Sequence, residues 1–166
     1  MLRAQDILLV LKIQASGGGT YADLGRSLGI SGSQVHSAAR RAIVSGLLRE
    51  DHSVRPNALL ETLLAVRYYV PAKLGGLERG IPTAYAAPPL SGKIRPSKDP
   101  MPVWPHPNGT ERGLSCEPIY KTAPEAALQD PALYEYLALV DTLRVGRARE
   151  VALARAELER RLAPKK

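Results

Sequence analysis

The side chains best suited to specific hydrogen bonding lie together in one short segment, residues 31–46. Apolar residues recur there at helical spacing, so the polar residues share the opposite face of a helix. Glutamine can pair with the edge of adenine, arginine with guanine or a phosphate, and serine with base edges or the backbone. The segment therefore carries groups able to bind nucleic acid. Its inward set is Val35, Ala38, Ala39, Ala42 and Ile43, and its outward set is Gly32, Ser33, Gln34, His36, Ser37, Arg40 and Arg41.

Catalytic chemistry has much weaker support in the chain. The motifs GxxxxGK[ST], HExxH, CxxC and GxSxG are absent. Cys116, the single cysteine, has no histidine nearby in sequence and no helix N-terminus to lower its pKa, which favours a buried or incidental thiol. His36, His52 and His106 are too scattered in sequence to indicate a metal site. We therefore expect a protein that is not an enzyme and has no cofactor or metal.

The charge balance favours a polyanionic partner. Lysine and arginine number 23 against 16 acidic residues, which gives a net charge of +7 and a pI near 9.8. This excess does not distinguish DNA from RNA or a membrane surface. Hydrophobic residues make up 45% of the chain and charged residues 23%, as in folded domains. Lys12 interrupts the first apolar stretch, so we expect no membrane span, no secretory signal and a cytoplasmic location.

The elements that position residues 31–46 can be predicted from apolar spacing and glycines. A first helix has its apolar face at Ile7, Leu8, Val10, Leu11 and Ala15 and ends at the glycines of residues 17–19. Thr20 and Ser31 stand where the N-caps of the next two helices are expected. Gly29 lies at the turn between them, where a left-handed backbone is needed. These are the parts of a helix-turn-helix.

Residues 20–48 resemble the winged helix-turn-helix transcriptional regulators of bacteria, of the MarR type and its relatives. The resemblance covers about residues 5–55. Gly25 stands where the family usually has alanine, and it still satisfies the need for a small residue between crossing helices. The matching residues are Thr20, Leu24, Gly25, Leu28, Gly29, Ile30, Ser31, Ser33, Val35, Arg40, Arg41, Gly46, Leu47 and Leu48.

The resemblance implies that the helix over residues 31–46 enters the major groove of DNA. Only a short hairpin fits before Pro56, and Glu50 and Asp51 would repel phosphate unless turned away. Helix starts and arginines would contact phosphate. A helix-turn-helix can instead serve as a protein-docking module, with these side chains solvated. The expected DNA contacts are Thr20, Ser31, Ser33, Gln34, His36, Ser37, Arg40, Arg41, Arg49 and Arg55.

The middle of the chain is rich in proline. Residues 81–118 hold nine of the 14 prolines, which exclude a long helix. Such a segment is either disordered or a packed covering arm. Asn108 and Gly109 are typical of a hairpin turn between the strands on either side. Trp104 could anchor a partner protein, although an anchor holding the arm to its own domain is the favoured interpretation.

Helical spacing returns in residues 122–162. Asp130 and Pro131 predict the start of a long helix, and Gly146 predicts a break in it. Beyond the break, a narrow apolar stripe indicates a two-helix seam, so we expect dimerisation there; the alternative is a helix packed on its own domain. The residues expected to serve a dimer or partner contact are Trp104, Tyr136, Val140, Val151 and Leu158.

These patterns predict a mostly α fold. It comprises a winged helix-turn-helix domain over residues 1–70, a Pro/Gly-rich covering arm or linker over 71–121, and a C-terminal helical segment over 122–166. The expected function is that of a homodimeric repressor that binds double-stranded DNA with helix 31–46. The alternative is a protein-interaction module, such as an antitoxin that restrains a partner protein through residues 80–166. RNA binding is less favoured because no RNA-binding signature is visible.

Overall fold

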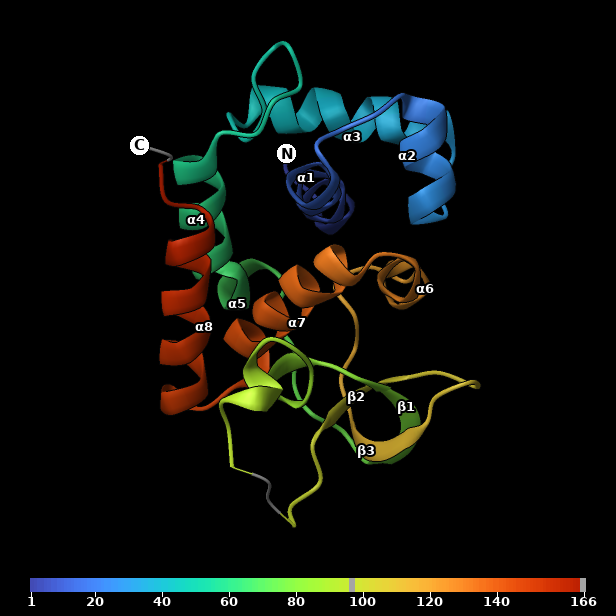
Figure 1. Cartoon of the computed structure of the whole chain (residues 1–166). Coiled ribbons are helices and arrows are strands. Elements are labelled where there is room, and N and C mark those ends of the chain that lie inside the picture. Colours follow the sequence, from blue (N-terminus) through green and yellow to red (C-terminus); the bar gives the residue numbers. More distant parts are fainter. Residues whose placement is uncertain (96–97, 165–166) are drawn as a thin grey trace.

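The computed structural model describes residues 1–95 and 98–164, and the chain is mostly helical (Figure 1). A small sheet and two short 3-10 turns lie at the end of the molecule opposite α3. The helices are α1 (Ala4–Ser16), α2 (Tyr21–Leu28), α3 (Gly32–Val44), α4 (Pro56–Leu64), α5 (Val66–Tyr69), α6 (Ala123–Gln129), α7 (Pro131–Val145) and α8 (Ala148–Arg161). The strands are β1 (Leu77–Pro82), β2 (Pro102–Pro105) and β3 (Glu111–Ser115), and the turns are η1 (Ala84–Ala86) and η2 (Leu90–Gly92).

The first three helices begin and end where the sequence predicts. The Thr20 hydroxyl accepts a hydrogen bond from the Asp23 amide at 3.1 Å, which caps α2. Gly29 ends α2 with a φ of +70°, in the left-handed region that favours glycine. A Cβ atom on Gly25 would lie 2.6 Å from the Ile30 carbonyl oxygen, so the close approach at this turn requires a glycine. The two capped helices and the tight glycine turn that the sequence predicts are therefore present.

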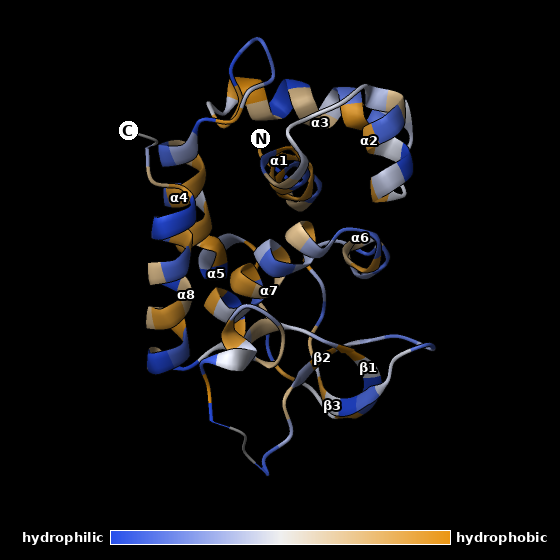
Figure 2. Ribbon diagram, viewed as in Figure 1, coloured by the Kyte–Doolittle hydropathy of each residue, from blue (hydrophilic) through white to orange (hydrophobic). Residues whose placement is uncertain are grey.

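A short hairpin over residues 47–55 follows α3 and rises beyond it (Figure 1). Leu48 and Val54 form an antiparallel bridge. The Arg49 amide donates to the Ser53 carbonyl at 2.8 Å, and the Arg55 amide donates to the Leu47 carbonyl at 2.9 Å. The hairpin tip is hydrophilic, whereas α1 at the centre of the molecule is hydrophobic (Figure 2).

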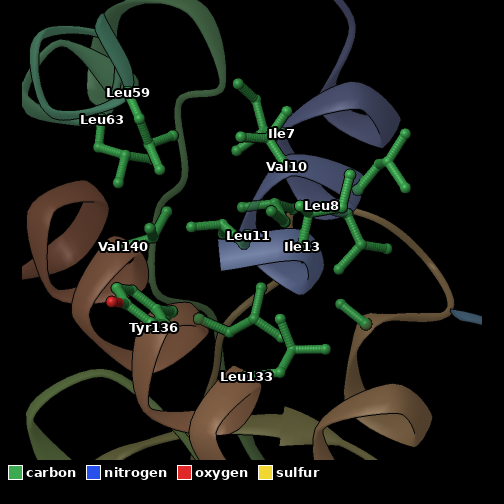
Figure 3. Packing of buried hydrophobic residues seen from close by; sticks show 14 of the residues in the cluster. Ile7, Leu8, Val10, Leu11, Ile13, Leu59, Leu63, Leu133, Tyr136 and Val140 are labelled. Atoms are coloured by element: carbon green, nitrogen blue, oxygen red, sulfur yellow. The ribbon is translucent and has the colours of Figure 1, made fainter. Parts of the chain in front are cut away.

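One hydrophobic core joins the N-terminal helices to the C-terminal ones. Helix α1 packs against α3 on one side and α7 on another. Figure 3 shows side chains of α1, including Ile7, Val10 and Leu11, filling the space next to α4 and α7. Because α1 is shared, the helix-turn-helix segment does not have a separate core.

The predicted dimer seam is wrong, because its residues lie inside the chain's own core. Helix α7 ends at Val145, and α8 turns back to pack on α7 and α4. A Cβ atom on Gly146 would lie 2.5 Å from the Thr142 carbonyl oxygen, which explains the glycine at this turn. The alternative, a helix packed on its own domain, is correct. Trp104, Tyr136, Val140 and Leu158 are buried, and Val151 is partly buried against the same core.

Most of the proline-rich segment is packed around a small closed sheet. Strands β2 and β3 each pair antiparallel with β1 and parallel with each other. The predicted Asn108-Gly109 hairpin between β2 and β3 is therefore wrong. Gly109 is instead needed because the backbone there passes close to Gly80 of β1: a Cβ atom on Gly109 would lie 2.4 Å from Gly80 Cα. Residues 106–110 thus pass against β1 at Gly80 and bring β3 in parallel to β2.

A cluster of charges fastens α8 to its neighbours. The nearly buried Glu157 carboxylate accepts a hydrogen bond from Arg161 Nε at 2.8 Å and from Arg160, and Lys93 Nζ lies 3.8 Å away. The hydrogen bond from Arg160 makes the largest contribution to lowering the pKa of Glu157 to about 2. Arg161 also pairs with Glu135 of α7 at 2.6 Å and stacks over the Tyr136 ring.

Replacing Glu157 with glutamine is expected to lower the free energy of unfolding by about 2 kcal/mol at neutral pH. The folded-state pKa lies below the ordinary glutamate value of 4.5, so the stabilisation is fully present above that pH and is lost as the pH falls through about 2. Urea unfolding of both proteins across this range measures the difference. Glu159→Gln, which removes an exposed pair with Arg155, is the matched control. If the stability lost in Glu157→Gln does not become smaller as the pH is lowered, the stabilising role of the ionised Glu157 carboxylate is contradicted.

Candidate nucleic-acid interface

The outward face of α3 is exposed as the sequence predicts. Val35, Ala38, Ala39 and Ala42 are buried against the neighbouring helices. Opposite them, polar side chains of the kinds that contact base edges and phosphate face solvent. These exposed residues are Ser33, Gln34, His36, Ser37 and Arg40.

Arg40 carries the most accessible positive charge on this face. Within residues 1–95 and 98–164, its guanidinium forms neither a hydrogen bond nor an ion pair. A guanidinium presents its donors in a fixed fork that matches guanine O6 and N7, or a phosphate. Arg55, at the base of the hairpin and before α4, is also exposed.

The prediction that Arg41 faces outward is wrong. Its Nε donates to Asp6 Oδ2 at 2.9 Å, and its Nη2 donates to Asp6 Oδ1 at 2.8 Å and to Gln5 Oε1 at 3.2 Å. The hydrogen bonds with Asp6 raise the pKa of Arg41. Asp6 lies in α1 and is fully buried, so it needs this partner. Arg41 therefore fixes α3 on α1 and is not a candidate for DNA contact.

Several side chains that were predicted to contact DNA cap the N-termini of helices. Ser31 Oγ accepts from the Gln34 amide at 3.1 Å, while Gln34 Oε1 accepts from the Ser31 amide at 2.9 Å. This reciprocal pair is a capping box. Within the described residues the Gln34 side-chain NH₂ has no partner, while pairing with adenine through both amide atoms would make Oε1 accept a second hydrogen bond beside the one from Ser31. Thr20 is likewise engaged in the cap of α2.

An aromatic contact joins α2, α3 and the hairpin. The Tyr21 ring, in the first residue of α2, lies edge-on to His36 and to His52, with each pair of ring centroids 5.6 Å apart. The Tyr21 hydroxyl is 2.9 Å from His52 Nε2. Residue types in the sequence gave no signal for this contact, because the three side chains come together only in the folded chain.

The hairpin presents acidic groups beside the exposed face. Glu50 and Asp51 are both exposed. Asp51 Oδ1 accepts from the Ser53 hydroxyl at 2.6 Å and from the Ser53 amide at 3.0 Å, and these bonds lower the pKa of Asp51. Arg49 Nη1 donates within the hairpin, to the Val54 carbonyl at 2.8 Å and to Ser53 Oγ at 3.3 Å. Arg49, which was expected to contact phosphate, thus already donates its hydrogen bonds within the hairpin.

A buried polar network lies far from this face and was not predicted from the sequence. Asp141 Oδ2 accepts from the Thr83 hydroxyl and from Trp104 Nε1, each at 2.7 Å, and Asp141 Oδ1 accepts from Arg144 Nη1 at 2.7 Å. Burial raises the pKa of Asp141, opposed by the Arg144 charge and these bonds. Arg144 also donates to the Val70 and Glu117 carbonyls. The network fastens the proline-rich segment to α7. It confirms the favoured interpretation of Trp104 as an anchor within its own chain, and the alternative of a partner contact through Trp104 is wrong.

No protein-family model, curated protein or solved structure matches the chain. Among the residues that the structure describes, none of the helices has the length and hydropathy required to cross a bilayer.

Proposed function

We propose that the protein binds double-stranded DNA through the exposed face of α3 and regulates transcription as a repressor. The observation that carries the proposal is the Arg40 guanidinium, which has no partner among the described residues and lies on the exposed face of the capped helix α3. Ser33 and Ser37 flank it on the same face. The resemblance of residues 20–48 to bacterial winged helix-turn-helix regulators supports the same function.

The chemistry divides between base contacts and backbone contacts. Arg40 would donate to guanine O6 and N7 in the major groove, while Ser33, Ser37 and the free NH₂ of Gln34 would reach neighbouring base edges. Backbone amides at the start of α3, beside Ser31, would contact phosphate. The net charge of +7 favours association with DNA of any sequence. A second copy would have to bind through another surface, because four of the five residues predicted for that contact lie in this chain's core and Val151 packs against it.

The test is selection of a preferred duplex from a random library, followed by titration across a salt series. We expect one enriched sequence, bound at least about a thousandfold more tightly than random DNA, with affinity that falls steeply as salt rises. Binding to every duplex with equal affinity would contradict a sequence-specific regulator. Absence of DNA binding even at low salt would contradict the proposal altogether.

A further inference from the structure

The hairpin over residues 47–55 contacts the helices at its base and at its tip. An open cavity of about 440 Å³ lies between residues 51–54 of the hairpin and helices α1, α2 and α3. The cavity floor includes Leu9 of α1 and Val35 of α3, and its rim includes Tyr21, Asp51 and His52. Leu47 and Leu48 are buried in the core and fix the base of the hairpin, but because this space is not filled by side chains, packing does not fix its tip against the helices.

The contact at the tip is the one between Tyr21 and His52. His52 has a φ of +68°, a left-handed conformation that costs a non-glycine residue about 1 kcal/mol. In this conformation its Nε2 reaches the Tyr21 hydroxyl at 2.9 Å, and the two rings meet edge to face. The turn is closed by the His52 amide, which donates to the Arg49 carbonyl at 2.8 Å. Tyr21 thus determines where the tip stands relative to α2 and α3.

The charges at this tip are unsuited to a DNA groove. Glu50 and Asp51 are exposed, and the Asp51 carboxylate is held by both Ser53 donors in its ionised form. Arg49 donates within the hairpin instead of extending from it. A tip that entered a groove beside α3 would bring two carboxylates against phosphates, which is unfavourable at any separation below the Debye length.

We propose that the hairpin restricts the access of DNA to the exposed face of α3 and does not itself enter the duplex. Tyr21 is a positioning residue that holds the tip against α2, and Glu50 and Asp51 are specificity-determining residues that repel misplaced phosphate. DNA then reaches α3 with the hairpin outside the groove. This inference rests on the proposed function, since it concerns how the same face selects DNA.

The electrostatic part is tested with the double variant Glu50→Gln/Asp51→Asn. At low salt we expect about fivefold tighter binding to random duplex DNA, with the gain lost when salt screens the charges. Binding to the selected duplex should gain less, so the selectivity ratio falls. Glu78→Gln/Glu111→Gln removes two exposed carboxylates from the small sheet at the other end of the molecule and is the matched control. Weaker or unchanged binding by the first variant overturns the proposal, as does an equal gain in the control.

The positioning part is tested with Tyr21→Phe, which keeps the ring and removes the hydroxyl. In the absence of DNA, we expect about fivefold faster hydrogen exchange at the Arg49 and His52 amides, and unchanged exchange in α3. With DNA, the selectivity ratio should fall although the free energy of unfolding stays near that of the wild type. Unchanged exchange overturns the role of Tyr21. Since the exchange measurement needs no DNA, a failure here is distinguishable from a failure of the proposed function, which would appear as a wild-type protein that binds no duplex.

Discussion

Replacing Arg40 with glutamine is expected to weaken binding to the selected duplex by about tenfold to a hundredfold. The side chain is exposed and unengaged within the described ranges, so its loss should leave the free energy of unfolding almost unchanged. Fluorescence anisotropy with the selected duplex and a scrambled one gives the two affinities. A larger loss for the selected duplex identifies a base contact, whereas equal losses identify a phosphate contact.

Two further arginine substitutions serve as controls for the Arg40 result. Arg155→Gln removes an exposed arginine of α8 that pairs with Glu159, and it tests the effect of net charge alone. Arg41→Gln leaves the buried Asp6 carboxylate without its ion pair, so we expect about 3 kcal/mol of lost stability. If Arg40→Gln binds the selected duplex as well as Arg155→Gln does, the assignment of α3 as the recognition helix is wrong.

Replacing Asp141 with alanine is expected to lower the free energy of unfolding by about 3–5 kcal/mol. The substitution leaves the buried Arg144 guanidinium without a counter-charge and takes the acceptor from Trp104 Nε1 and the Thr83 hydroxyl. Unpaired buried donors each carry a desolvation cost. Urea unfolding measures the loss, and quenching of fluorescence from Trp104, the single tryptophan, reports whether it has become accessible.

The double variant Asp141→Leu/Arg144→Met separates charge from packing. Because no unpaired charge remains buried, we expect a smaller loss than in Asp141→Ala, even though two carbonyl groups lose their Arg144 donor. A double variant that is less stable than the single one would show that the hydrogen bonds from Arg144 to the Val70 and Glu117 carbonyls matter more than the ion pair.

Local sequence signals were sufficient to predict α2, α3 and the turn between them. Thr20, Ser31 and Gly29 act within a few residues of their own positions, as caps and as a left-handed turn, so their roles are legible without knowledge of the rest of the chain. The inward small residues of α3 follow from helical spacing for the same reason. Arg41 lies at the edge of that face, and only the distant Asp6 of α1 draws it inward.

Long-range partners account for the predictions that are wrong. The narrow apolar stripe on α8 would look the same in the sequence whether it packed on a second copy or on its own chain. In the structure it packs on α7 and α4 of the same chain. Asn108 and Gly109 carry a turn signal, but the direction of β3 is determined where Gly109 meets Gly80. Asp141 and Arg144 are spaced as an ordinary i, i+3 pair, and nothing in their spacing shows that β2 and η1 will cover them.

The position of α1 between α3 and α7 means that residues 1–70 are not an independent folding unit. Residues 1–70 expressed alone would present to water the α1 surface that α7 normally covers, and would aggregate or remain unfolded. Fusions intended to present α3 on another protein must therefore include the chain through α8. For the same reason heating should melt both ends of the molecule together, as a single calorimetric transition.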